Sequence, residues 1–390
     1  MKQLKKNTPK KQTKKNIKKK LSKKIQSTLI DNLGWSSSSA KLAGCLIIGL
    51  LSTASVWHKR IIEAMANANQ IESDVRATQR FFSNTHVDYH QYSRMIYDML
   101  KIGGKITIVL DRTNWKFGRV HINIFVATVL YKADGQDQSF AVPIVWDVLD
   151  KAGTSNTQER KKLMREILAI VGSENIEVVL ADREFIGHEW IQFLLENSIP
   201  FIIRLRNDMY VMHDGKRVNA SSLFTEVKYN EKLLYSVTLN DIPVQLAGTR
   251  SIEGELVVVI ASMEVPGDLL STYRLRWLIE LFFKSIKSQG FNIEDTHMTD
   301  PARIKLLFAL ISYATVLVVQ AGMIRNHVKK IKIKNHGRPT FSLFTYGLDL
   351  WRTLFRGTVP SYFRKFLDFL LPPSKTYSAL LQAEVENYAL

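Results

Sequence analysis

Cysteine is nearly absent from this sequence, because Cys45 is the only one among 390 residues. A single cysteine excludes a disulfide scaffold and any zinc site built from several thiolates. Hydrophobic residues make up 46% and charged residues 23% of the chain. These ordinary values exclude a wholly disordered or fibrous protein. Because the chain is longer than one compact core usually allows, we expect two or three domains.

Acidic residues are missing altogether from residues 1–24, which hold twelve lysines. The whole chain has 54 basic and 36 acidic side chains, a net charge of +18, and this excess predicts a polyanionic partner, either nucleic acid or an anionic membrane. A lysine block of this kind repels itself and has little to bury, so we expect residues 1–24 to form a disordered lysine-rich arm. Two roles are open for the arm, a clamp on the DNA backbone and a solubilising tail.

Apolar runs suited to a membrane span are also scarce. Leu42–Val56 is about fifteen residues long and is diluted by glycine, serine and threonine, whereas a spanning helix needs roughly 20 apolar residues. Pro301–Met323 is longer, but Arg303 and Lys305 lie at its edge. We expect both segments to be buried helices and predict no membrane partner. A membrane-anchored basic protein is the rival interpretation.

Residues 25–101 have a helical pattern, which changes after Gly103-Gly104 to short β-branched runs. Strands are predicted at 105–110, 121–131, 139–148, 176–180 and 200–205, with helices at 156–171 and 188–196. Further strands are predicted at 233–246 and 255–263. This order indicates an α/β fold with a mixed sheet flanked by helices. Asp111 and Asp182 each follow a predicted strand, the position where such sheets hold ligands and ions, although one aspartate there is more often a turn former.

A third candidate acid lies in the segment Tyr273–Lys287, which is predicted to be one helix. Polar side chains recur there at spacings of 3, 4, 4 and 3 residues and share one stripe, namely Tyr273, Arg276, Glu280, Lys284 and Lys287. The opposite face is apolar and suited to packing on a sheet. A plain amphipathic helix with a Glu280–Lys284 pair would also fit, but it does not explain why Tyr273 and Trp277 accompany the charges. Aromatic and basic side chains together suit contacts to DNA.

These residues resemble the signature Y-x2-R-x3-E-x6-K of DDE transposases from bacterial insertion sequences, specifically the insertion-sequence-four family. The contexts of the first two acids, LDRTNW around Asp111 and ADRE around Asp182, are similar to those of the family. The resemblance covers residues 101–317. It implies an RNase H-like mixed sheet, a β-strand insertion before the catalytic-glutamate helix and an all-helical N-terminal domain.

The resemblance also implies roles for individual residues. Asp111, Asp182 and Glu280 would be the catalytic acids and would bind two Mg²⁺ ions, with Mn²⁺ as a substitute. Carboxylates are the ligands that such hard cations prefer. The DNA-binding residues would be Tyr273, Arg276, Trp277, Lys284 and Lys287. Tyr273 and Arg276 would hold a backbone phosphate near the transposon end, and Trp277 would stack on a base.

The expected domains are the arm at 1–24, a helical DNA-end-binding domain at 25–101, a catalytic domain at 102–325 with its insertion at about 207–266, and a C-terminal helical segment at 326–390. The expected partner is double-stranded DNA, as terminal inverted repeats and as target, and the expected oligomer is a homodimer. A bacterial transposase would be cytoplasmic and nucleoid-associated. An inactive DNA-binding relic and an RNase H-like nuclease without joining activity are further alternatives.

Overall fold

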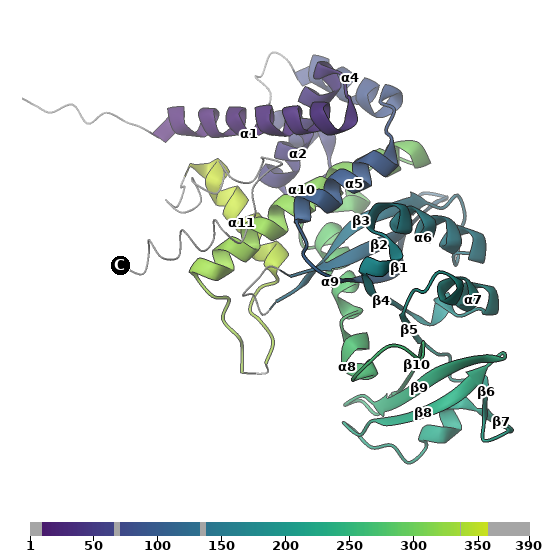
Figure 1. Ribbon diagram of the computed structural model, residues 1–390. Coiled ribbons are helices and arrows are strands. Elements are labelled where there is room, and N and C mark those ends of the chain that lie inside the picture. The colour runs from purple at the N-terminus through teal and green to yellow at the C-terminus, as the bar shows by residue number, and fades with distance from the viewer. Residues whose placement is uncertain (1–9, 66–70, 133–137, 336, 358–390) are drawn as a thin grey trace, which may run out of the picture. The chain divides into compact units, whose positions relative to one another are not determined.

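The computed structural model describes residues 10–65, 71–132, 138–335 and 337–357, and it divides the chain into two compact units (Figure 1). The helical unit contains the described parts of 1–101, 132–140 and 283–390, and the sheet unit contains 102–131 and 141–282. The sheet unit therefore ends earlier than the catalytic domain expected at 102–325. The difference arises because the long helix at 301–328 packs among the N-terminal helices.

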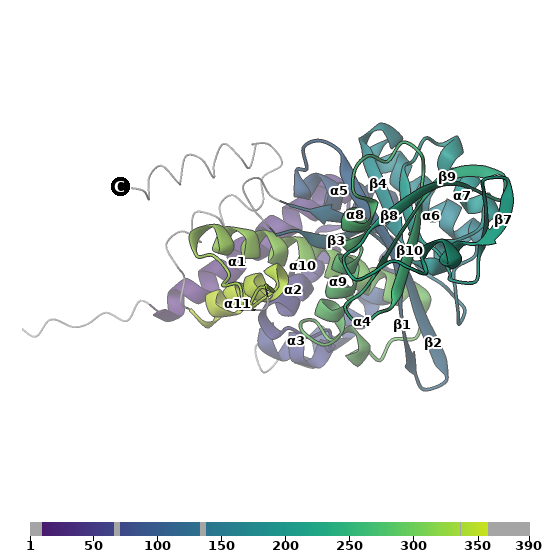
Figure 2. The ribbon, with the colours of Figure 1, turned by 90° about the horizontal axis from the view of Figure 1, so that it is seen from below.

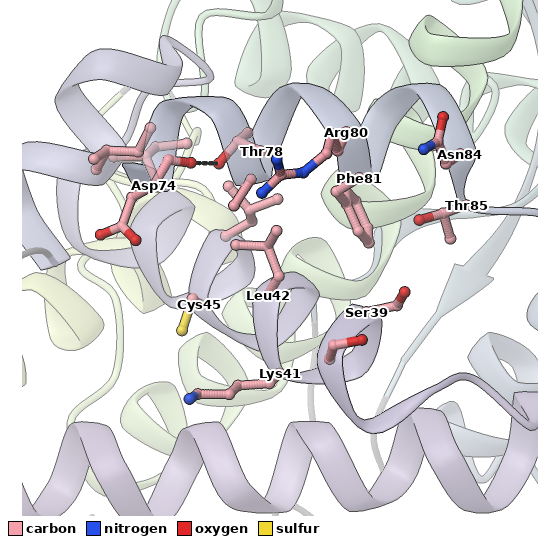
Figure 3. A pocket seen from close by; sticks show the side chains of 15 residues that line it. Ser39, Lys41, Leu42, Cys45, Asp74, Thr78, Arg80, Phe81, Asn84 and Thr85 are labelled. Atoms are coloured by element: carbon pink, nitrogen blue, oxygen red, sulfur yellow. Dashed lines mark hydrogen bonds between the residues drawn. The ribbon is translucent and has the colours of Figure 1, made fainter. Parts of the chain in front are cut away.

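The helical unit is formed by helices from the N-terminal and C-terminal regions of the chain. Its described helices are α1 (Lys10–Leu33), α2 (Ser37–Thr53), α3 (His58–Met65), α4 (Ile71–Asn84), α5 (Tyr89–Leu100), α10 (Pro301–Val328) and α11 (Leu343–Arg356). Figures 1 and 2 show α1, α2, α10 and α11 side by side, in agreement with their contacts. The N-terminal region is all-helical, as predicted.

Helix α1 corrects the prediction of a disordered arm. Residues 10–24 belong to this helix, while residues 1–9 lie outside the described part of the chain. Leu21, Ile25 and Leu29 recur every four residues and are buried, and α1 contacts α2, α5 and α11. Lysine is a good helix former, and adding a turn to an existing helix is much easier than starting one. The lysine segment therefore continues a helix that its apolar neighbours anchor.

Helix α10 is long and apolar enough to cross a membrane, yet every residue of its most apolar window is buried inside the protein. It contacts α2, α5 and α11. Helix α2, which contains most of the other apolar run, also buries its apolar residues. Both segments are thus buried helices, as predicted, although α10 was expected in the catalytic domain and lies in the helical unit. Packing accounts for their hydrophobicity.

Two glycines allow α10 and α11 to approach closely. A Cβ atom on Gly347 would lie 1.9 Å from the carbonyl oxygen of Val318 and 2.6 Å from the amide nitrogen of Gly322. We expect Gly347→Ala to push the helices apart and to lower the free energy of unfolding by about 1–3 kcal/mol. Thermal unfolding would measure this loss. Gly103→Ala is the matched control, because a methyl group there meets no atom within 4 Å, and an equal effect of both changes would contradict the close crossing.

His58 on α3 is half-buried, and its inner ring nitrogen has no polar partner among the described residues. Its ring stacks on Phe82 of α4, with centroids 4.9 Å apart, and its Nε2 atom has no hydrogen-bond partner among the described residues. Burial lowers the pKa of His58 to about 4, whereas an unfolded histidine titrates near 6.5. Between these two values the unfolded chain binds a proton that the folded chain does not, so acidification through this range favours unfolding.

We therefore expect His58 to remove about 2 kcal/mol of stability when the pH falls from about 7.5 to about 5. His58→Phe keeps an aromatic ring against Phe82 and cannot titrate. Its melting temperature should fall less than that of the wild type over this pH interval. Parallel melting curves at the two pH values would check this, and an equal fall in both proteins would rule out the assigned cause.

The sheet unit contains one mixed sheet of ten strands in the order β3-β2-β1-β4-β5-β10-β9-β8-β6-β7. The first five strands are β1 (Ile106–Phe117), β2 (Val120–Tyr131), β3 (Phe140–Val148), β4 (Ile176–Ala181) and β5 (Phe201–Arg204). β1 pairs antiparallel with β2 and parallel with β4, and β4 pairs parallel with β5. Helices α6 (Thr157–Val171) and α7 (His188–Glu196) follow β3 and β4 in the chain. The predicted α/β class, a mixed sheet flanked by helices, is confirmed.

The predicted insertion is an extension of this sheet. It comprises β6 (Tyr210–His213), β7 (Lys216–Asn219), β8 (Leu233–Leu239), β9 (Ile242–Arg250) and β10 (Leu256–Ala261). Because β10 pairs antiparallel with β5, the inserted strands share one hydrogen-bonded sheet with β1 and β4 (Figure 1). The chain then enters α8 (Leu269–Arg274) and α9 (Trp277–Lys287). The insertion thus precedes the glutamate helix, as predicted.

Candidate active site

Asp111 and Asp182 lie at the same end of two neighbouring parallel strands. The last paired residues of β1 and β4 are Leu110 and Ala181. Asp111 is the next residue of β1, and Asp182 is the first residue after β4. Parallel strands are roughly 4.8 Å apart, so the pairing brings the two carboxyl groups near each other. The strand expected to end at Leu110 continues to Phe117, because residues 111–117 pair with β2. Asp111 is therefore at the end of the pairing with β4 but inside β1.

The segment predicted to be a single helix is broken between α8 and α9. The amide of Arg276 donates to the carbonyl oxygen of Tyr273 at 2.9 Å, and the amide of Leu275 donates to that of Thr272 at 3.0 Å. These shorter i→i+3 bonds are typical of a tight 3₁₀ turn. One consequence is that Leu275, which one continuous helix would place on its apolar face, is 40% exposed. Arg276 still lies one turn before Glu280, so this part of the predicted stripe is retained.

Arg276 connects the acid of β1 with the acid of α9. Its Nη1 atom is 3.2 Å from Oδ2 of Asp111, and its Nη2 atom forms an ion pair with Oε1 of Glu280. Asp182 lies within electrostatic reach, since its charge raises the pKa of Asp111 and Arg276 lowers the pKa of Asp182. Arg276 thus bonds two of the three acids, which are remote in sequence, and its charge acts on the third.

The negative charges of Asp111 and Asp182 are only partly balanced by nearby donors and cations. Burial, followed by the charge of Asp182, raises the pKa of Asp111 to about 7, although the amide of Arg112 and the charge of Arg276 oppose the shift. Burial also raises the pKa of Asp182, while a hydrogen bond from the amide of Glu184 opposes it. Crowded and desolvated carboxylates gain stability from a bound cation. A divalent ion bound at this site would therefore stabilise the ionised form of both carboxyl groups.

A family model described as a transposase DDE domain matches residues 103–317. This match covers more than half of the chain, and all three acids and Arg276 lie within it. The chain belongs to the DDE transposase family.

Two solved structures are similar to this transposase. A piggyBac transposase synaptic complex with hairpin DNA has 10% sequence identity and a TM-score of 0.47, with 93% of this chain and 85% of that chain covered. Endonuclease V from Bacillus subtilis has 12% identity and a TM-score of 0.27, with 64% of this chain and 96% of that chain covered. No curated protein matches the chain in sequence. At these TM-scores neither likeness bears on function, which rests on the family match and the site.

The donor set of the transposase suits magnesium, but its acids are not yet arranged around an ion. Among the described residues, no group of three histidine, cysteine, aspartate or glutamate side chains is placed to hold a metal. Asp111, Asp182 and Glu280 offer only carboxylate oxygens, the ligands that Mg²⁺ prefers. Arg276 already bonds two of them. The residues therefore fit a magnesium site provided that Arg276 withdraws.

Tyr273 lies beside this cluster with an unused hydroxyl group. The side chain is 8% exposed, and its hydroxyl has no hydrogen-bond partner among the described residues. Burial raises the pKa of Tyr273 to about 12, and the charges of Arg276 and Arg204 oppose that rise. The hydroxyl therefore remains a proton donor within range of the charges of Arg276 and Arg204, although Arg204 is itself paired with Glu255. Sequence reasoning missed Arg204, whose only signal was a cation at the end of a predicted strand.

The other predicted DNA contacts are in different states. Trp277 is 58% exposed and Lys284 is also exposed, so both side chains are accessible to a partner. Lys287 forms an ion pair with Glu294 at 2.8 Å, and it would have to exchange that carboxylate for a phosphate. Lys284 and Lys287 lie in the last turn of α9, and α9 belongs to the helical unit from Phe283 onward.

Proposed function

We propose that this transposase cleaves the ends of an insertion sequence and joins them to target DNA by in-line phosphoryl transfer. The observation that carries the proposal is that Arg276 bonds Asp111 and Glu280, while Asp182 follows the strand paired with β1, in a chain with the family's domain. Mg²⁺ bound by the three carboxylates, or Mn²⁺ in its place, would activate the attacking oxygen and stabilise the leaving oxygen. The signature around Glu280 supports the insertion-sequence-four family as the specific branch.

The chain's own residues would position the DNA. Tyr273 donates its free hydroxyl, and Arg276 its guanidinium group, to a backbone phosphate near the transposon end. The guanidinium group of an arginine binds phosphate strongly because it is charged and can donate two parallel hydrogen bonds to the phosphate oxygens. Exposed Trp277 stacks on a base at the end. Lys284 and Lys287 add contacts to the same strand.

The helical unit would supply the remaining contacts to DNA. Lys19, Lys20 and Lys23 are exposed on α1, which suits a sequence-independent contact with the phosphate backbone. Residues 25–101 would bind the terminal inverted repeat. A reaction that joins two ends requires both to be held together, so we propose a homodimer in the complex. Such a protein would associate with the bacterial nucleoid.

A strand-transfer assay tests the proposal directly. Purified full-length protein is incubated with Mg²⁺, labelled duplexes carrying the element ends, and a target plasmid. We expect joined products that are absent when EDTA replaces Mg²⁺. Cleavage without joining would instead indicate a nuclease, and DNA binding with neither reaction would indicate an inactive relic. Either outcome would overturn the proposed function.

A further inference from the structure

A buried ion pair links the two strand ends that carry Asp111 and Asp182. Nε of Arg112 donates to Oε1 of Glu184 at 2.6 Å, and Nη2 donates to Oε2 at 2.5 Å. The two side chains are only 10% and 15% exposed. A guanidinium and a carboxylate that meet through two parallel bonds fix both distance and orientation. Arg112 directly follows Asp111, and Glu184 is two residues after Asp182.

The backbone of each partner holds one of the aspartates. The amide of Arg112 donates to Oδ1 of Asp111 at 2.7 Å, and the amide of Glu184 donates to Oδ1 of Asp182 at 3.0 Å. The residues that form the ion pair are thus the same residues that orient the two carboxylates. A change in the distance between Arg112 and Glu184 would therefore move both carboxyl groups.

Arg112 is also tied to a third part of the sheet unit. Its Nη1 atom donates to Oδ1 of Asn123 at 3.1 Å and to the carbonyl oxygen of Gly153 at 2.5 Å. Asn123 lies on β2, is almost fully buried, and donates to the carbonyl oxygens of Lys151 and Gly153. The guanidinium group therefore joins β1, β2, the loop after β3 and the turn after β4. No other cation can reproduce four such directed bonds.

We propose that Arg112 and Glu184 are positioning residues that set the separation and orientation of Asp111 and Asp182 for the divalent ions. This inference rests on the proposed function. It assigns one shared task to Arg112 of the segment Asp111-Arg112-Thr113 and to Glu184 of the segment Asp182-Arg183-Glu184. Residues that orient metal ligands typically change metal affinity or activity by about 10- to 100-fold when they are replaced.

The test uses Arg112→Lys, which keeps the charge and loses the paired bonds. Calorimetric titration of the full-length protein with Mn²⁺ should show affinity reduced about 10- to 100-fold, with an unchanged near-ultraviolet circular dichroism spectrum. The Mn²⁺ concentration for half-maximal cleavage should rise, and kcat should recover at saturating Mn²⁺. Arg250→Lys is the matched control, because Arg250 also bonds backbone carbonyl oxygens but lies in the inserted strands. It should bind Mn²⁺ like the wild type.

A second variant covers the case in which Arg112→Lys does not fold. The double change Arg112→Gln with Glu184→Gln leaves the net charge unaltered and retains an amide pair, so it should fold and show the same loss of Mn²⁺ affinity. Wild-type affinity in a folded variant of either kind would overturn the inference. Failure of the proposed function is distinguished by Asp111→Asn. If Asp111→Asn binds as much Mn²⁺ as the wild type does, Asp111 is not a metal ligand. The proposed metal site is then wrong, and the inference falls with it.

Discussion

Asp111→Asn, Asp182→Asn and Glu280→Gln should each reduce strand cleavage by about 10³-fold or more while binding of the element end stays nearly intact. A metal ligand supplies several kcal/mol of transition-state stabilisation, and each 1.4 kcal/mol corresponds to about tenfold in rate. Each replacement keeps the size of the side chain and removes only its charge. Cleavage of a labelled end and a gel-shift assay on the same preparations would measure the two effects separately.

The matched control for the three acids is Glu177→Gln. Glu177 lies near the start of β4, whereas Asp182 follows the end of the same strand. The carboxylate of Glu177 accepts a hydrogen bond from the hydroxyl of Thr107. The same chemical change there should leave cleavage unaltered. Retained cleavage in any one of the three variants would remove that residue from the metal-binding set.

Stability offers an independent check that Asp111→Asn does not act by unfolding the protein. The pKa of Asp111 is raised to about 7 in the folded chain, above its ordinary value near 3.9. The folded state therefore binds the proton more tightly, and the cost of ionising this buried group grows as the pH rises between these values. Asparagine avoids that cost. In EDTA the variant should be more stable than the wild type at pH 8, by up to about 4 kcal/mol, and the gain should vanish at low pH.

The sequence predicts the elements of the site better than their exact bounds. Strand runs followed by Asp111 and Asp182 were visible, because β-branched residues buried on both faces give continuous apolar stretches. The continuation of β1 through Thr113 and Trp115 was missed, although these alternate residues are buried. Alternation of this kind is the signal of a strand with one buried face, and it could have extended the prediction past Asp111.

Tertiary packing explains what the sequence could not show. No glycine or proline marks the break between α8 and α9, so helical periodicity favoured one continuous helix. Both the ion pair of Arg112 with Glu184 and the unpaired hydroxyl of Tyr273 depend on strands and helices far apart in the chain. The lysine arm was misjudged because composition alone favoured disorder. Its helix depends on buried Leu21 and Ile25, which lie at or beyond the end of the lysine block.

Replacement of Arg276 should produce two effects of opposite sign. The guanidinium group that bonds Asp111 and Glu280 occupies the carboxylate oxygens that a divalent ion needs, and the same group is proposed to bind a DNA phosphate. Arg276→Gln should therefore weaken assembly of the end complex by roughly 10- to 100-fold, the value of charge-assisted hydrogen bonds worth about 1.5–3 kcal/mol. Without DNA, it should bind Mn²⁺ more tightly than the wild type.

The change in Mn²⁺ affinity shows whether Arg276 competes with the divalent ion for the carboxylates or only supports the site. Removing an arginine that only supports the acids would weaken Mn²⁺ binding, whereas removing a competitor strengthens it by roughly tenfold per 1.4 kcal/mol of lost ion pairing. Arg276→Lys is the matched control, because it retains one positive charge between the two acids and should show a smaller change in both measurements. Calorimetry without DNA and gel-shift with the element end provide the two values. A variant that binds Mn²⁺ more weakly than the wild type would show that Arg276 supports the acids and does not compete for them.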